Sequence, residues 1–197
     1  MTSQPVRVLD LFQQTGAYHK GHFRLTSGLH SPEYLQSAIV LSWPQHAETL
    51  GRELASRILG LLPQKDVALV ISPALGGLII GHEVARALGV PFFFTERDAD
   101  RKMSLRRGFT LKPGDRVVVV EDVITTGGST KEVIDIVRAA GAIPVAAGSI
   151  IDRSGGAVDL GIPRAALETL NVVAYQPDEC PMCKAGQPLV KPGSRPA

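Results

Sequence analysis

The stretch Val117–Thr130, VVVVEDVITTGGST, decides the fold. Four valines run into two adjacent carboxylates, and a turn of threonines, glycines and a serine follows them. A short, wholly apolar run is typical of a strand that is covered on both faces of a sheet. The stretch therefore predicts a buried strand, a tight turn and the start of a helix, in that order.

Similar apolar runs elsewhere predict the other strands of the same sheet. The expected strands lie at Val67–Pro73, Val90–Phe94, Arg116–Asp122, Ile143–Ile151 and Leu170–Tyr175. Helical patterns separate them, at Leu75–Gly89 and at residues 129–142. A further helix is expected from Ser42 to Leu61, with Ser42 as its cap and Pro44 in its first turn. Strands that alternate with helices predict an α/β fold with a central, mostly parallel sheet flanked by helices.

The chain is expected to form a single domain over residues 1–197. About the first 40 residues do not follow the strand–helix rhythm, so we expect them to form a hood subdomain. From about residue 176 to residue 197 the sequence is rich in proline, glycine and polar residues. That composition predicts an extended tail on the surface.

Composition excludes several classes of function. Lys and Arg number 21 against 19 Asp and Glu, a net charge of +2 that gives no support for nucleic-acid binding. No apolar run approaches the roughly 18 residues that cross a bilayer. The start of the sequence, MTSQPVRVLD, lacks the basic and apolar regions of a signal peptide. With only two cysteines, a cytoplasmic protein without a membrane or nucleic-acid partner is expected.

The turn TTGGST has the chemistry of a phosphate site. Small residues, hydroxyls and backbone N–H groups precede a helix N-terminus, but no Gly-Lys-Ser/Thr follows as in a Walker A loop. Glu121 and Asp122 would repel a phosphate, whereas they can accept hydrogen bonds from sugar hydroxyls or face a divalent cation through water. A ribose 5-phosphate unit satisfies both halves. The alternative is a plain strand-to-helix turn in which Asp122 or a threonine caps the helix.

The stretch resembles the phosphoribosyl-diphosphate signature of the type I phosphoribosyltransferases, in which the acids contact the ribose and the loop holds the 5-phosphate. The resemblance implies the type I phosphoribosyltransferase fold with an N-terminal hood. It also implies a set of donor-binding residues. They are Arg97, Glu121, Asp122, Val123, Ile124, Thr125, Thr126, Gly127, Gly128, Ser129 and Thr130.

Two further motifs resemble the orotate phosphoribosyltransferases, over a span from about Phe12 to Arg195. They are GHFRLTSGLHSPEYLQ at residues 21–36 and DRSGG at residues 152–156. Orotate is a carboxylated pyrimidine, and an arginine fork matches a carboxylate in a bidentate way, so Arg153 is the candidate for it. The other expected orotate contacts are Thr26, Ser27, Gly28 and Thr125. Alternatively, Arg153 pairs with Asp152 or Asp159, and SGLHSP is only a turn.

The chain departs from better-known members of that family at three places. Thr26 stands where they have a lysine, and Gly76 stands at the expected place of another. The lid segment at residues 96–109, ERDADRKMSLRRGF, has no histidine. Its cations are Arg97, Arg101, Lys102, Arg106 and Arg107. We expect Arg101 and Lys102 to act in catalysis beside Glu121 and Asp122, unless the lid is a solvated, self-paired surface.

The resulting hypothesis is transfer of a phosphoribosyl group from the diphosphate donor to N1 of orotate, with Mg²⁺ carried by the donor and no metal bound directly by the chain. The resemblance implies a homodimer whose lid serves the neighbouring active site. One alternative is transfer to a purine or to uracil. Another is a non-catalytic regulator that senses the donor, an alternative that the missing lysines leave open. Against a regulator, the chain has no room for an appended DNA-binding domain.

The motif CPMC at residues 180–183 has metal-ligand spacing, but no second Cys or His pair lies nearby in the sequence. Reduced surface thiols are the favoured interpretation, and a zinc ion shared across a dimer is the alternative. His22 and His30 flank the base-site segment, where roles in packing or at the surface are equally compatible with the sequence.

Overall fold

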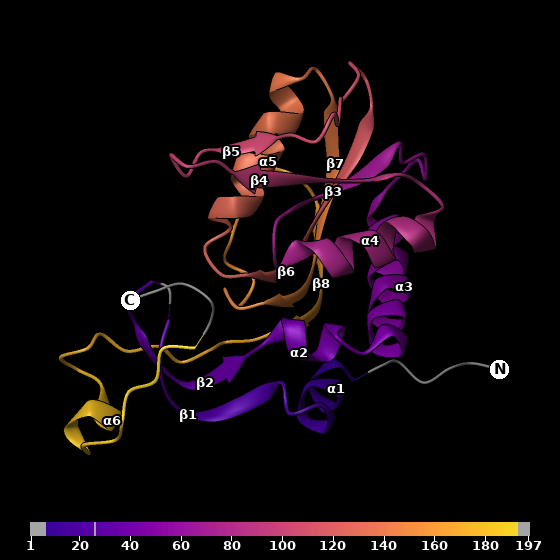
Figure 1. Ribbon diagram of the computed structural model, residues 1–197. Coiled ribbons are helices and arrows are strands. Elements are labelled where there is room, and N and C mark those ends of the chain that lie inside the picture. The colour runs from indigo at the N-terminus through magenta and orange to yellow at the C-terminus, as the bar shows by residue number, and fades with distance from the viewer. Residues whose placement is uncertain (1–6, 26, 193–197) are drawn as a thin grey trace.

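A six-stranded sheet forms the centre of the protein, whose computed structural model describes residues 7–25 and 27–192 (Figure 1). Its strands are β3 (Leu69–Pro73), β4 (Phe92–Arg97), β5 (Met103–Leu105), β6 (Arg116–Ile124), β7 (Ile143–Asp152) and β8 (Arg164–Thr169). The strand order is β5-β4-β3-β6-β7-β8. All neighbouring strands are parallel except β4 and β5. The expected mostly parallel sheet is confirmed.

The remaining elements form the two helical layers and the hood. The helices beside the sheet are α3 (Pro44–Leu61), α4 (Gly77–Leu88) and α5 (Gly128–Ala139). The hood consists of α1 (Val8–Gln14), the antiparallel pair β1 (Tyr18–Arg24) and β2 (His30–Leu35), and α2 (Ser37–Leu41). A last short helix, α6 (Pro181–Lys184), lies beside the hood, below the sheet in Figure 1. No helix of the described residues is long and apolar enough to span a membrane.

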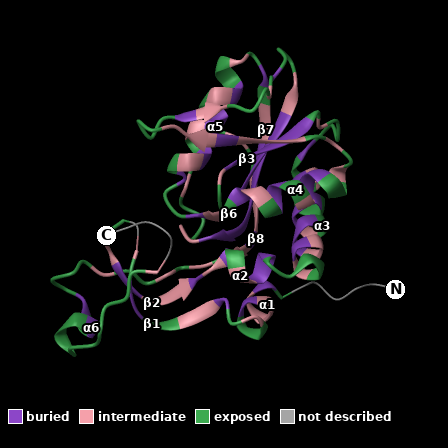
Figure 2. Cartoon of the chain, viewed as in Figure 1, coloured by how far each residue is buried: buried purple, intermediate pink, exposed green. Residues whose placement is uncertain are grey.

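The four consecutive valines of β6, Val117 to Val120, are fully buried because both faces of the strand are covered (Figure 2). Val118 and Val120 pack in the core cluster that contains α3 and α4, whereas Val117 and Val119 pack in the cluster that contains α5. Alternate side chains of a strand point to opposite faces, so one apolar run serves both cores. This double burial fixes where β6 ends, and with it the position of the acidic pair.

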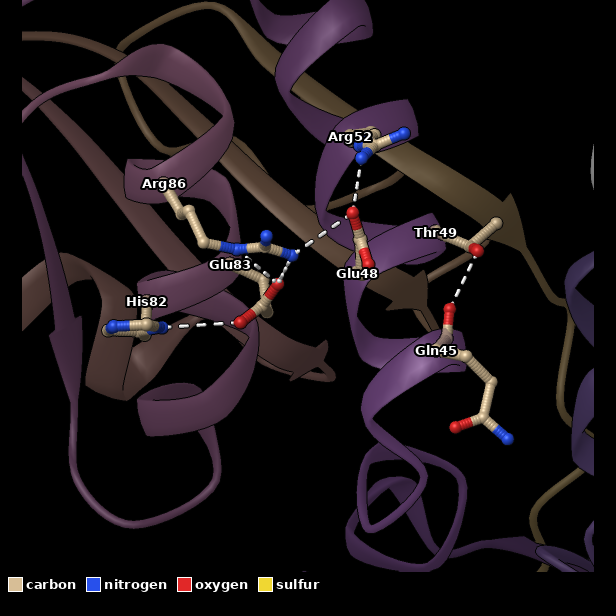
Figure 3. A network of polar contacts seen from close by, with 7 residues as sticks. All are labelled: Gln45, Glu48, Thr49, Arg52, His82, Glu83 and Arg86. Carbon is tan, nitrogen blue, oxygen red and sulfur yellow. Dashed lines mark hydrogen bonds and ion pairs between the residues drawn. The ribbon is translucent and has the colours of Figure 1, made fainter.

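Helices α3 and α4 touch closely at Gly51, where an added Cβ would lie 2.5 Å from Cβ of Glu83. Around this contact an exposed polar network connects the two helices through Glu48, Arg52, Glu83 and Arg86 (Figure 3). Exposed ion pairs of this kind contribute roughly 0–1 kcal/mol each. The close approach permitted by glycine, more than the charges, therefore sets the packing of the two helices.

Two local predictions are wrong. Ser42 does not cap α3; it ends α2, and its hydroxyl donates to the carbonyl of Ile39 at 2.7 Å. The last strand is β8, and the expected strand Leu170–Tyr175 instead leaves the sheet to reach the hood, where Tyr175 pairs with His30. An edge strand covered mainly on one face does not need a continuous apolar run, which is why the sequence pattern missed it.

A buried ion pair joins β7 to β8. Arg164 Nη1 lies 2.5 Å from Asp152 Oδ2, and the Asp152 side chain is 1% exposed. Asp152 Oδ1 also accepts hydrogen bonds from the backbone N and the hydroxyl of Ser154, at 2.8 and 2.6 Å. Burial alone would raise the pKa of Asp152, but the hydrogen bonds from Ser154 and Arg164 outweigh it and lower the pKa below its ordinary value.

Replacing Arg164 by methionine should lower the free energy of unfolding by about 3 kcal/mol near neutral pH, because Asp152 is left buried and charged without its partner. Arg52→Met, which removes an exposed pair with Glu48, should cost less than about 1 kcal/mol. Urea unfolding of both variants measures the difference. Because the folded pKa of Asp152 is depressed, the gap between Arg164→Met and wild type should shrink as pH falls below about 4. Equal costs for the two variants would contradict this account.

Candidate active site

The acidic pair lies at the carboxyl end of β6, where open parallel sheets bind ligands. Glu121 is 8% exposed, and Asp122 is half-buried beside it. Burial is the main cause that raises the pKa of Glu121 well above its usual range, and the neighbouring Asp122 raises it further. The site therefore favours a neutral Glu121 next to a second carboxyl group, a state suited to hydrogen bonding with hydroxyls.

The turn after β6 presents backbone N–H groups at the start of α5. Gly127 occupies the N-cap position with φ of 74°, and the first helical hydrogen bond runs from Lys131 N to Gly127 O at 2.9 Å. The N–H groups of residues 128–130 therefore have no acceptor in the helix. A Cβ at Gly127 would lie 2.7 Å from Val158 Cγ1, so glycine is required here for space as well as for its backbone angle. The alternative in which Asp122 or a threonine caps the helix is wrong.

The loop between β3 and α4 comes directly against Asp122. An added Cβ at Gly76 would lie 2.6 Å from Asp122 Oδ1 and 2.9 Å from Asp122 Cγ. The peptide bond between Ala74 and Leu75 in this loop is cis. A lysine at position 76 would collide with Asp122 unless that carboxylate moved. Glycine at position 76, where a lysine was expected from the family resemblance, therefore fits the observed position of the Asp122 side chain.

Arg153 follows β7 and lies next to the end of β6, since its backbone N donates to the carbonyl of Ile124 at 2.8 Å. Its Nε is buried and has no hydrogen-bond partner within residues 7–25 and 27–192. Asp152 is occupied by Arg164 and Ser154, and Asp159 accepts from the backbone N of Gly161. Neither alternative pairing of Arg153 is therefore present. Burial lowers the pKa of Arg153, and the charges of Tyr34 and Glu33 oppose that shift.

The hood contributes a tight turn and one aromatic side chain. In the turn between β1 and β2, Leu25 N donates to Leu29 O at 2.8 Å and Gly28 N donates to Leu25 O at 2.9 Å. The N–H of Gly28, an expected orotate contact, is therefore already used within the turn. Thr26 lies outside the described residues.

Tyr34, on β2, is a hood residue that interacts electrostatically with the sheet and was not among the expected site residues. Burial raises the pKa of Tyr34, the positive charge of Arg153 lowers it, and Asp122 raises it. Tyr34 is thus within electrostatic range of Asp122 and Arg153, the residues expected to contact the sugar and the base. Its only signal in the sequence was its position inside the segment at residues 21–36.

The lid is a hairpin of β4 and β5 with its turn at residues 98–102. Part of its charge is paired: Arg97 makes two hydrogen bonds to Glu132 on α5, at 2.8 and 2.9 Å, and Arg107 makes two to Glu96, at 2.7 and 2.8 Å. Arg101 and Lys102 at the turn are exposed and form no ion pair with any described residue. The lid thus combines one arginine paired to α5 and one paired within the lid with two cations at its tip that form no ion pair with a described residue.

Comparison with known proteins identifies the family. The sequence profile of the phosphoribosyl transferase domain matches residues 40–162. Over 188 residues, 95% of this chain and 96% of the relative, the sequence is 55% identical to an orotate phosphoribosyltransferase of Pelotomaculum thermopropionicum. The chain belongs to the orotate phosphoribosyltransferase family. An orotate phosphoribosyltransferase of Desulforamulus reducens is 52% identical over 95% of this chain and 96% of its own length.

The family assignment extends beyond the sheet. The domain profile leaves out the hood and the residues after 162, but the alignments with full-length orotate phosphoribosyltransferases cover 95% of the chain. The crystal structure of the orotate phosphoribosyltransferase from Aeropyrum pernix has the same fold, with a TM-score of 0.68 at 26% identity. That similarity covers 83% of this chain and 93% of the other. The predicted type I phosphoribosyltransferase fold is confirmed.

Replacing Glu121 by glutamine should stabilise the protein at alkaline pH. The pKa of Glu121 is raised on folding, so the protein loses stability as pH rises from the unfolded value of about 4.3 through the folded value. Glutamine has the same shape and does not titrate, so it removes this loss. The free energy of unfolding of the variant should exceed that of wild type by at least about 1 kcal/mol near pH 8. At about pH 4 the gain should vanish. Urea unfolding across this pH range measures it.

Glu168→Gln on β8, a carboxyl group without an ion pair among the described residues, is the control and should track wild type. A Glu121→Gln variant with a constant stability difference at every pH would show that Glu121 does not titrate as inferred.

Proposed function

We propose that the chain transfers the 5-phosphoribosyl group from 5-phospho-α-D-ribose 1-diphosphate to N1 of orotate, in the biosynthesis of UMP. The products are orotidine 5'-phosphate and pyrophosphate. The family assignment supports the reaction as a whole. The observation that carries the choice of acceptor is Arg153, a guanidinium with a buried, unpartnered Nε beside the end of β6.

The donor binds at the end of β6 and the start of α5. Its 5-phosphate accepts hydrogen bonds from the N–H groups of residues 128–130, where the helix dipole also favours negative charge. The hydroxyls of Thr125, Thr126 and Ser129 add further donors. This arrangement places the ribose over Glu121 and Asp122.

The acidic pair orients the ribose and stabilises the positive charge that develops on it during the reaction. In the free protein the raised pKa of Glu121 favours its neutral form, which can donate to one ribose hydroxyl while Asp122 accepts from the other. Bond breaking at the anomeric carbon builds positive charge on the sugar ring. The negative charge that the pair carries lies close to this positive charge and stabilises it, so the pair contributes more to the transition state than to the ground state.

The acceptor binds between β7 and the hood. Arg153 forms a bidentate contact with the carboxylate of orotate, and its partial burial strengthens that contact relative to water. The backbone N–H of Ser27 and the ring of Tyr34 face the pyrimidine from the hood. N1 of orotate bonds to the anomeric carbon with inversion while the bond from that carbon to pyrophosphate breaks. The acidic N1 proton passes to solvent, so no strong protein base is required.

The leaving pyrophosphate is handled by Mg²⁺ and by the lid. Mg²⁺ would enter with the donor and neutralise the pyrophosphate charge as part of the bound substrate, and the acidic pair can face the ion through water. Arg101 and Lys102 are exposed at the hairpin tip and available to the pyrophosphate. In the proposed homodimer each lid serves the neighbouring subunit. The proposal places the enzyme in the cytoplasm, where its free cysteines stay reduced.

One assay tests the reaction. Purified protein is mixed with the diphosphate donor, Mg²⁺ and orotate, uracil, adenine or guanine in turn, and pyrophosphate release is measured. Release with orotate alone is expected. Release with another base but not with orotate would overturn the acceptor assignment, and donor binding without any turnover would favour a regulator.

Arg153→Ala should raise the KM for orotate by about 10- to 100-fold, the cost of losing hydrogen bonds to a charged group. Binding of the donor should change by less than about twofold, because Arg153 lies at the other end of the reacting pair. Steady-state kinetics and calorimetry with the donor measure the two effects. Arg138→Ala, on the exposed face of α5, is the control and should change neither. Equal damage to orotate use and donor binding would refute the role of Arg153.

Arg101→Ala/Lys102→Ala should lower kcat by about 10²-fold, as expected when transition-state charge loses its stabilisation. Mixing this variant with Arg153→Ala tests the sharing of lids. If each lid serves its neighbour, a mixed dimer contains one complete site, and random reassortment restores about a quarter of wild-type activity. Lys112→Ala, just beyond the lid, is the control for kcat. Failure of the mixture to gain activity would place each lid over its own subunit's site.

A further inference from the structure

Four potential metal ligands meet beside the hood, although they are far apart in the sequence. His22 comes from β1, His30 from the start of β2, and Cys180 and Cys183 from the motif CPMC around α6. Their ligand atoms all lie within 4.8 Å of one another, and no other such cluster occurs in the part of the chain that the structure describes. The favoured sequence interpretation of surface thiols is wrong for Cys180, which is fully buried.

The distances within the cluster match a tetrahedral metal site. Tetrahedral Zn²⁺ with ordinary bond lengths separates two nitrogens by roughly 3.3 Å and a nitrogen from a sulfur by roughly 3.5 Å. Here His22 Nε2 and His30 Nδ1 are 3.0 Å apart. His22 Nε2 lies 3.5 Å from Cys180 Sγ and 3.6 Å from Cys183 Sγ, and His30 Nδ1 lies 3.2 Å from Cys183 Sγ. The four atoms therefore surround a space of the size that one zinc ion needs.

A hydrogen bond outside the cluster orients one of the ligands. His22 Nδ1 lies 2.9 Å from the carbonyl oxygen of Gln187, which can only accept, so Nδ1 carries the proton. The lone pair of the neutral imidazole is then on Nε2, the atom that faces both sulfurs. Histidines that bind metals commonly donate their other N–H to a carbonyl or carboxylate in this way.

We propose that His22, His30, Cys180 and Cys183 bind one Zn²⁺ ion within a single chain. Two thiolates and two imidazoles form a donor set that zinc prefers, and oxygen-preferring Mg²⁺ does not fit it. Four protein ligands fill a tetrahedral shell and leave no position for water or substrate, so the ion has a structural role.

The ion connects the hood hairpin to the C-terminal segment, residues 170–192. This segment also pairs with both strands of the hairpin: Tyr175 with His30, and Val190 with His22 and Arg24. Most of its side chains are exposed, so it has few apolar contacts of its own to hold it in place. Closing the loop between the histidines and the cysteines with a metal ion supplies that missing stability.

Metal analysis of the untagged, full-length protein tests the proposal. Purified under reducing conditions, the wild-type protein should contain about one Zn²⁺ per chain. Protein stripped with a chelator and loaded with Co²⁺ should show the intense visible bands of tetrahedral cobalt and a thiolate-to-cobalt charge-transfer band. Cys183→Ser, a change at the exposed ligand, should lose the charge-transfer intensity of one thiolate, and Cys180→Ser/Cys183→Ser should lose zinc altogether. His19→Gln, on the same strand as His22, is the matched control and should keep zinc and the wild-type cobalt spectrum.

Three results would overturn the proposal. The first is reduced wild-type protein that contains no zinc and shows no thiolate band with Co²⁺. The second is full zinc content in Cys180→Ser/Cys183→Ser, which would place the ion elsewhere. The third is a metal-free native protein that is lighter by two hydrogens and resists thiol alkylation, which would show that the two cysteines form a disulfide. The wild-type measurements stand even if a variant folds poorly.

Discussion

Strand β6 must be buried along its apolar run and must carry charge near its carboxyl end. The rest of the site depends on that constraint. The four valines are buried on both faces, so the strand cannot shift along its neighbours without exposing apolar surface or burying more charge. Glu121 and Asp122 are thereby held at the edge of the sheet. The glycines on either side complete the arrangement, because Gly76 leaves room for Asp122 and Gly127 lets α5 begin close to Val158.

The charges of the site are divided between elements that the fold keeps apart. Carboxyl groups gather at the end of β6, whereas the guanidinium of Arg153 follows β7, and Asp152 is prevented from neutralising Arg153 by its own buried pair with Arg164. Arg164, which stabilises the junction of β7 and β8, thus also leaves Arg153 without an ion pair to Asp152. A sugar that becomes positive and a base that carries a carboxylate can be bound side by side without either being drawn to the wrong partner.

The sequence was informative where one segment decides its own structure. The central strands and the helices ending at Gly89 and near Gly141 could be predicted because burial and backbone angle act locally. Strand β8 and the end of α2 could not, because edge pairing and capping depend on distant neighbours. The close approach of Gly76 to Asp122, and the cluster of His22 and His30 with the two cysteines, form only when segments far apart in the chain meet. For the cluster, the spacing of CPMC indicated two of the four ligands, and nothing in the sequence connected them to His22 and His30.

The pairing of the C-terminal segment with the hood has a consequence for biosynthesis. The hydroxyl of Ser31 donates to the carbonyl of Val173, 142 residues later, and His22 contacts Gln187, 165 residues later. During translation the hairpin therefore lacks these partners until a further 142 to 165 residues have been made. The sheet can assemble before then, since its strands are close in order. The pairing of the hood hairpin with residues 173–190 is therefore completed after the sheet.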